Sequence, residues 1–165
     1  MFSEKWDRRF LELAAFVAQW SKDPSTKTGA AIVRPDKTVA SIGYNGFAKG
    51  ASDDPAIYAD RKVKYDLIIH CEMNALIHSR EPVEGYALYT WPFACCIRCA
   101  VAMLQAGIRD FVAPNPTEDA LTRWGDSFTM TRKHILDCGG KVTEIGKPED
   151  SGRRAATCMG WILRT

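Results

Sequence analysis

Hydrophobic residues recur along this chain with two alternating periods, one typical of helices and one typical of strands. Across residues 3–20 the apolar positions lie three and four residues apart, which predicts an amphipathic helix. Two runs rich in small and β-branched residues follow at 29–34 and 38–42, and the Pro35-Asp36-Lys37 segment between them predicts a hairpin.

The remaining pattern continues this alternation to residue 145. Residues 48–58 are polar and predict a loop, which leads into a helix that runs on past Lys64. Helices are predicted from His70 to about residue 79, over 96–106 and over 121–136, the last one interrupted at Gly125. Strands are predicted at 86–90, 108–113 and 141–145. Five strands that alternate with helices indicate an α/β protein with one central sheet.

Length and composition fit a single compact domain. The chain has 165 residues, of which 46% are hydrophobic and 25% are charged. We expect a domain over residues 1–146, followed by a tail over 147–165 that contains Gly, Pro, Ser and Arg but is apolar near its end. The role of this tail does not follow from its composition.

Charge and hydropathy exclude several classes of function. The 22 Lys and Arg residues are scattered among 20 Asp and Glu residues, so nothing indicates a long nucleic-acid partner. No apolar run has the length of a membrane span, and the first residues lack the order of a secretory signal. We therefore expect a soluble, cytoplasmic protein without a membrane partner.

Two of the six cysteines and one histidine form a candidate metal site. Cys96 and Cys99 are three residues apart, so on a helix both face the same side, and His70 begins another predicted helix. Three ligands leave one position open for water, as in catalytic zinc sites. Two alternatives stay open at this point: a closed zinc site with Cys95 or Cys71 as the fourth ligand, and a redox pair.

Glu72 adds a proton carrier to this site. It follows His70 by two residues, too near in sequence to join the same tetrahedron comfortably, so it is available for acid-base chemistry. A His-x-Glu motif followed by Cys-x-x-Cys is a known signature of zinc-dependent nucleobase deaminases.

With these motifs, the chain resembles the deoxycytidylate (dCMP) deaminase family. The matching segments run in family order across residues 6–142, and the first and third are more typical of the dCMP group than of other zinc deaminases. They are Ser21-Lys22-Asp23-Pro24, Gly29-Ala30, Gly43-Tyr44-Asn45-Gly46, Ser52-Asp53-Asp54, Lys64-Tyr65, His70-Cys71-Glu72-Met73-Asn74-Ala75 and Gln105-Ala106-Gly107-Ile108.

The resemblance implies a cytidine deaminase-like fold, a three-layer αβα sandwich around a mixed sheet of about five strands. It also implies hydrolysis of dCMP to dUMP and ammonia, which supplies dUMP for thymidylate synthesis. By position, His70, Cys96 and Cys99 match the zinc ligands, and Glu72 matches the proton shuttle.

The resemblance also implies substrate contacts and regulators. Asn45 matches an asparagine that contacts the sugar, and the backbone amide of Cys71 matches one that contacts the pyrimidine. Ser25 and Thr26 lie where the sugar-phosphate end is expected. Members of the family commonly form homo-oligomers, including hexamers, and are often activated by dCTP and inhibited by dTTP at a separate site with Mg²⁺. Residues 46–54 fall near that region.

Three positions depart from the family pattern, and other functions stay open. Cys71 replaces a small apolar residue, while Cys95 and Ala48 each replace a proline. A deaminase of dCTP, cytidine or another nucleobase compound would keep the same metal chemistry. A non-catalytic nucleotide-binding homologue is disfavoured by the intact Glu72, and a nucleic-acid editing module by the near-neutral charge.

Overall fold

The computed structural model describes residues 2–146, so the predicted tail at 147–165 lies outside the described residues. None of the described helices combines the length and the hydropathy that a membrane span requires. The elements in chain order are α1 (Glu4–Ala18), β1 (Gly29–Val33), β2 (Val39–Tyr44), α2 (Pro55–Ala59), α3 (Arg61–Leu67), α4 (Cys71–His78), β3 (Ala87–Trp91), α5 (Ile97–Gln105), β4 (Asp110–Pro114), α6 (Glu118–Asp137) and β5 (Lys141–Ile145).

The strands form one five-stranded sheet in the order β2-β1-β3-β4-β5. β1 pairs antiparallel with both β2 and β3, which confirms the predicted hairpin. β3, β4 and β5 are mutually parallel, so a helix crosses over between each consecutive pair. The mixed five-stranded sheet expected from the sequence is therefore confirmed.

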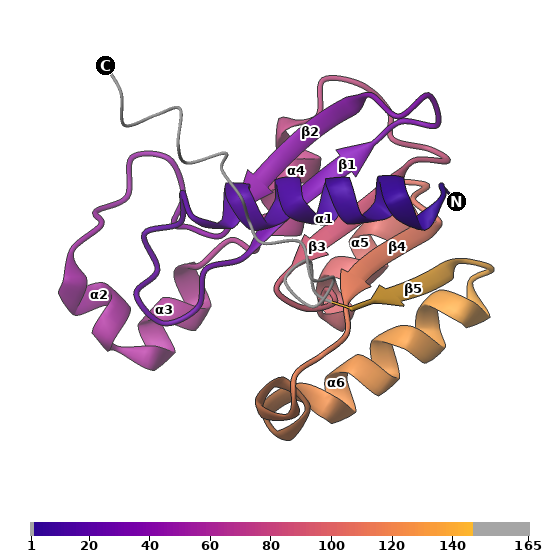
Figure 1. Ribbon diagram of the computed structural model, residues 1–165. Coiled ribbons are helices and arrows are strands. Elements are labelled where there is room, and N and C mark those ends of the chain that lie inside the picture. The colour runs from indigo at the N-terminus through magenta and orange to yellow at the C-terminus, as the bar shows by residue number, and fades with distance from the viewer. Residues whose placement is uncertain (1, 147–165) are drawn as a thin grey trace, which may run out of the picture.

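Helices cover both faces of this sheet. α1 crosses one face, where Phe10 and Leu11 pack with Tyr89 of β3 (Figure 1). The other face packs against α4, α5 and α6, where Met103 and Ile135 meet Leu88 of β3. Because successive strand residues point to opposite faces, each strand contributes to both cores. The result is the predicted three-layer αβα sandwich.

Two details of the sequence prediction are corrected. The helix expected to run past Lys64 is divided at Asp60, whose side chain accepts hydrogen bonds from the backbone amides of Lys62 and Val63 and caps α3. α6 continues through Gly125 without interruption. A glycine costs a helix interior only about 1 kcal/mol, which the packing of this long helix can offset.

One glycine permits a close approach that positions the next layer. A Cβ atom on Gly43 of β2 would collide with the backbone of Cys71 and of Ala75 in α4. Only a residue without a side chain fits where the strand and helix meet so closely. This contact fixes the start of α4 against the sheet.

Candidate active site

The three predicted metal ligands lie together where α4 and α5 begin. His70 precedes α4 as its N-cap, Cys96 precedes α5 as its N-cap, and Cys99 lies in the first turn of α5. The His70 Nδ1 atom is 3.5 Å from Cys96 Sγ and 3.4 Å from Cys99 Sγ. All three ligand atoms lie within 4.8 Å of one another.

The electrostatics of these residues fit a metal site. A hydrogen bond from Cys99 and the neighbouring His70 lower the pKa of Cys96 to about 4 despite burial. The contact with Cys96 raises the pKa of His70, and the same thiolate together with burial raises the pKa of Cys99. One imidazole and two sulfurs form a donor set that suits zinc and leaves a fourth position open.

Glu72 lies in the first turn of α4, next to the metal ligands. Its side chain is 5% exposed, and burial raises the pKa of its carboxyl group. The Cys71 thiol donates to Glu72 Oε2 at 3.2 Å. Burial raises the pKa of Cys71 well above its ordinary value, so this neighbour remains a neutral donor.

A pocket of about 530 Å³ opens beside His70, Cys96 and Glu72. Its volume falls within the range of small-molecule sites. The predicted substrate contacts all line it. Its lining comprises Asp23, Ser25, Thr26, Thr28, Asn45, Arg61, Lys64, Tyr65, Ile68, His70, Cys71, Glu72, Trp91, Phe93, Ala94, Cys96, Arg123, Trp124, Ser127 and Phe128.

A hydrogen-bond network at one edge of the pocket joins two of the sequence motifs. Asp23 Oδ1 accepts from Lys64 Nζ at 2.7 Å and from the backbone amides of Ser25 and Thr26 at 2.8 and 3.2 Å. Asn45 Nδ2 donates to Asp23 Oδ2 at 3.2 Å and to the Thr26 carbonyl at 2.9 Å. The network holds Ser25, Thr26 and Asn45 in fixed positions at the pocket edge.

An aromatic wall of the pocket was missed by the sequence analysis. Phe93 lies between β3 and α5, and its ring centroid is 4.9 Å from that of Trp124 and 5.8 Å from that of Phe128. The helical spacing of Trp124 and Phe128 marked an apolar face of α6 but not what that face contacts. Arg61 and Arg123 were missed as well, because no motif includes them, and Tyr65 belongs to the Lys64-Tyr65 motif but was given no role in the site.

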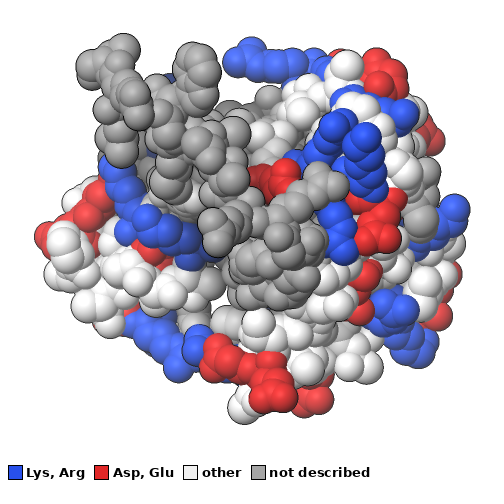
Figure 2. Space-filling model, in the orientation of Figure 1, with Lys and Arg blue, Asp and Glu red and all other residues white. Residues whose placement is uncertain are grey.

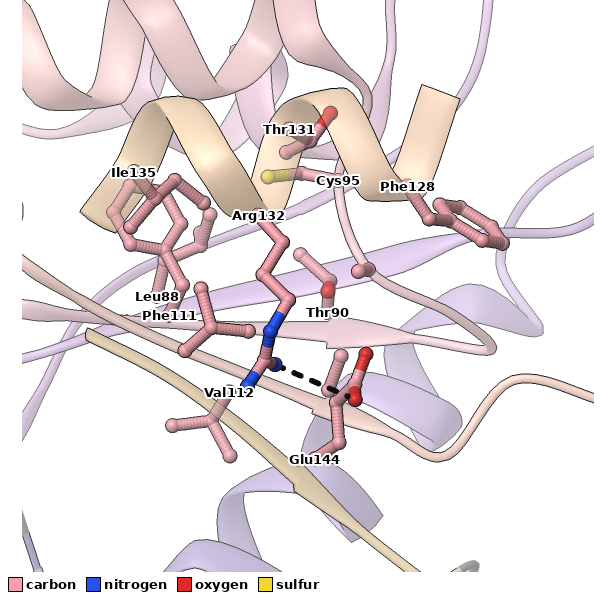
Figure 3. Close-up of a pocket in the computed structure, with 13 residues that line it drawn as sticks. Leu88, Thr90, Cys95, Phe111, Val112, Phe128, Thr131, Arg132, Ile135 and Glu144 are labelled. Carbon is pink, nitrogen blue, oxygen red and sulfur yellow. Dashed lines mark ion pairs between the residues drawn. The ribbon is translucent and has the colours of Figure 1, made fainter. Parts of the chain in front are cut away.

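Cys95 lies behind the metal site rather than in it. Its buried sulfur lines a small cavity beneath α6, together with Thr90 and Thr131 (Figure 3). The ion pair of Arg132 with Glu144, 3.6 Å apart, lies at the same cavity. Neither Cys95 nor Cys71 belongs to the group of converging ligand atoms. The arrangement therefore favours an open metal site over a closed one.

A three-layer αβα fold with this His, Cys and Cys group and an adjacent buried glutamate defines the class of zinc-dependent nucleobase deaminases. The profile of the family described as "Cytidine and deoxycytidylate deaminase zinc-binding region" matches residues 4–114. The chain belongs to this cytidine and deoxycytidylate deaminase family.

Individual relatives agree with this assignment. A protein named "Uncharacterized deaminase in luxG 3'region" from Aliivibrio fischeri is 37% identical over 139 residues, 84% of this chain and 92% of that protein. The mouse (Mus musculus) deoxycytidylate deaminase is 37% identical over 114 residues, and the match spans 66% of this chain but only 64% of the mouse protein.

A solved structure confirms the fold. The dCMP deaminase of the cyanophage S-TIM5 in apo form superposes with a TM-score of 0.67 and 19% identity, covering 87% of this chain and all of the phage chain. At this identity the likeness concerns the fold alone.

Proposed function

We propose that this protein is a zinc-dependent hydrolase that converts dCMP and water to dUMP and ammonia, and so supplies dUMP for thymidylate synthesis. The observation that carries the proposal is the buried Glu72 beside the converging His70, Cys96 and Cys99, with Glu72, His70 and Cys96 lining a pocket of about 530 Å³. The mouse and human relatives that carry the name deoxycytidylate deaminase support dCMP as the substrate.

His70, Cys96 and Cys99 would hold the zinc ion. Their convergence within 4.8 Å supports this assignment, and so does the thiolate form of Cys96 beside an imidazole. When bound in such a site, zinc makes water available as a nucleophile at neutral pH.

Glu72 moves the protons of the reaction. Its carboxylate takes a proton from the attacking water and delivers it to N3 of the pyrimidine. A second proton transfer through the same carboxylate reaches the exocyclic amine, which then leaves as ammonia. Burial favours the protonated form of Glu72, so the group can donate as well as accept.

The substrate contacts belong to the same proposal. Cys71 is the first residue of α4, so its backbone N–H has no acceptor within the helix and can donate to the pyrimidine. Asn45 is oriented by its bonds to Asp23 and Thr26, which supports a contact with the sugar. Ser25 and Thr26 are assigned to the sugar-phosphate end.

Assembly and regulation extend the proposal. We infer a cytoplasmic homo-oligomer, a hexamer as in the family, with activation by dCTP and inhibition by dTTP near residues 46–54 in the presence of Mg²⁺. Lys22 and Asp53, 2.5 Å apart, connect the 46–54 segment to the loop that carries Ser25. Both signs of charge are interspersed over the visible face (Figure 2), which suits a small nucleotide better than a long nucleic acid.

The test is ammonia release from dCMP, dCTP, cytidine and dAMP, each with and without added dCTP or dTTP. We expect dCMP to be the preferred substrate. Preference for dCTP or cytidine would keep the chemistry and correct the substrate. If none of the four compounds released ammonia although zinc was bound, the protein would be a non-catalytic nucleotide-binding homologue.

A further inference from the structure

The Cys71 side chain contacts the carboxylate that moves the protons. It is 2% exposed, and its thiol donates to Glu72 Oε2 at 3.2 Å. Within residues 2–146, no other side chain donates a hydrogen bond to this carboxylate. The orientation of Glu72 therefore depends on a neighbour that is not one of the converging metal ligands.

The Cys71 thiol is itself held by Thr28. The Thr28 hydroxyl donates to the Cys71 sulfur, and the Thr28 backbone N–H donates to Asn45 Oδ1 at 2.7 Å. Asn45 Nδ2 donates in turn to Asp23 at 3.2 Å. A chain of hydrogen bonds thus connects the edge of the pocket, through Thr28 and Cys71, to Glu72.

Packing keeps the Cys71 side chain in this place. It belongs to the core between the sheet and the helices, together with Ala75 and Cys95. The close approach at Gly43 holds the backbone of Cys71 against β2. Because both the backbone and the side chain are confined, the thiol is a donor with a fixed position relative to Glu72.

This contact is particular to the chain. Cys71 stands where the family pattern has a small apolar residue. Such a residue would offer the same backbone N–H to a pyrimidine, but it would have no side-chain donor for the carboxylate. The hydrogen bond from the thiol to Glu72 is therefore an addition to the family site.

We propose that Cys71 is a positioning residue, whose thiol holds Oε2 of Glu72 so that Oε1 is the oxygen that carries protons to the pyrimidine. This inference rests on the proposed deaminase function and deepens it. Both proton transfers pass through the same carboxylate, so fixing one of its oxygens keeps the other in an orientation that reaches the substrate. The thiol therefore acts on kcat, whereas the backbone N–H of Cys71 acts on binding.

The test compares Cys71→Ala, Cys71→Ser and Thr28→Val with Cys95→Ala. All four variants keep the backbone N–H. Cys95 is 3% exposed and belongs to the same core, but it lies outside both the converging ligands and the lining of the active-site pocket. Cys95→Ala therefore controls for the loss of a buried sulfur. Initial rates with dCMP give kcat and KM, and metal analysis gives zinc content.

We expect Cys71→Ala to lower kcat about 3- to 10-fold, the effect of one hydrogen bond. KM for dCMP and zinc content should stay near wild type. Cys71→Ser should recover most of the loss, because its hydroxyl can donate to the same oxygen. Thr28→Val should cause a smaller loss, and combined with Cys71→Ala it should add nothing, because Thr28 acts through the thiol.

The infrared S–H stretching band tests the same hydrogen bond without turnover. The band of Cys71 is identified by its disappearance in Cys71→Ala. In the wild-type protein we expect it at a lower frequency than that of a free thiol. In Glu72→Gln it should move to a higher frequency, because an amide oxygen accepts more weakly than a carboxylate.

Three results would overturn this role for Cys71. They are a kcat of Cys71→Ala equal to that of Cys95→Ala, a loss that Cys71→Ser does not recover, and a Cys71 band at the same frequency in wild type and Glu72→Gln. Failure of the deaminase proposal has a different signature, namely a wild-type protein that contains zinc but releases no ammonia from dCMP. In that case the S–H band still decides whether Cys71 holds the Glu72 carboxylate.

Discussion

At the scale of single residues, the site depends on one carboxylate that does not belong to the metal group. Replacing Glu72 with Gln keeps the size of the side chain but removes its ability to carry a proton. We expect ammonia release from dCMP to fall at least about 100-fold, since acid-base catalysis contributes about 10²–10⁴. Zinc content, measured by metal analysis, should stay at the wild-type ratio. Retained activity would show that another group moves the proton.

The adjacent cysteines allow a second prediction at this scale. Cys96 belongs to the converging ligand group, whereas Cys95 faces the small cavity beneath α6. Cys96→Ser should therefore lose zinc, and Cys95→Ser should retain it. Metal analysis of both purified variants, with circular dichroism to confirm folding, distinguishes them. Zinc loss in Cys95→Ser with zinc retained in Cys96→Ser would move the ligand assignment by one residue.

At the scale of elements, the site depends on how closely β2 packs against α4. Gly43→Ala places a methyl group into the backbone of Cys71 and Ala75, so α4 must move. We expect a loss of about 1–3 kcal/mol in the free energy of unfolding, typical of overpacking, together with reduced kcat because Glu72 moves with α4. Urea unfolding and initial rates measure the two effects.

Gly46→Ala is the matched control for this prediction. Gly46 lies in the same Gly-Tyr-Asn-Gly motif, and a Cβ atom added there would meet no other atom within 4 Å. The stability and kcat of this variant should remain near wild type. If Gly43→Ala behaved the same way, the close approach would not be what positions α4.

The elements also show which parts of the fold could be predicted from sequence patterns. The helix from residue 3, the hairpin and the three later strands could be predicted because each has a local hydrophobic period, although the parallel direction of those strands could not. The division at Asp60 could not, because a side-chain cap there competes with continuation of the helix. The aromatic face of α6 was visible as a pattern, but its partner Phe93 comes from a distant loop.

The active site likewise contains residues that a local sequence pattern predicts and residues that only the tertiary structure brings together. The metal ligands and Glu72 could be predicted from short spacings, His-x-Glu and Cys-x-x-Cys, that place them on two helix starts. Arg61 and Arg123 carry no such spacing. They share one pocket only because α3 and α6 are arranged around the same end of the sheet, which is a property of the tertiary structure.

At the scale of the whole molecule, one buried ion pair connects segments that are far apart in the sequence. Asp23 follows α1 and Lys64 lies in α3, 41 residues later, and Asn45 links the pair to the end of β2. Removing one partner of a buried pair leaves the other charge uncompensated and typically costs about 3–5 kcal/mol. The pair therefore stabilises both the fold and the edge of the pocket.

This pair predicts how stability depends on pH. Burial alone would raise the pKa of Asp23, but hydrogen bonds from Lys64 and from the turn that follows hold it below its ordinary value. Because the folded-state pKa is lower than the unfolded value of about 3.9, the contribution of Asp23 is complete above that pH and is lost as pH falls through the folded-state pKa.

Asp23→Asn should therefore be less stable than wild type at pH 7, and its free energy of unfolding should decrease less steeply below about pH 4. Urea unfolding at constant ionic strength across this range gives both quantities. Asp53→Asn is the control, because Asp53 pairs with Lys22 at the exposed surface and such pairs contribute little. Equal acid slopes in wild type and Asp23→Asn would show that the buried pair does not control acid stability. A lower acid slope in Asp23→Asn alone would assign that part of the pH dependence to the contact between the α1–β1 loop and α3.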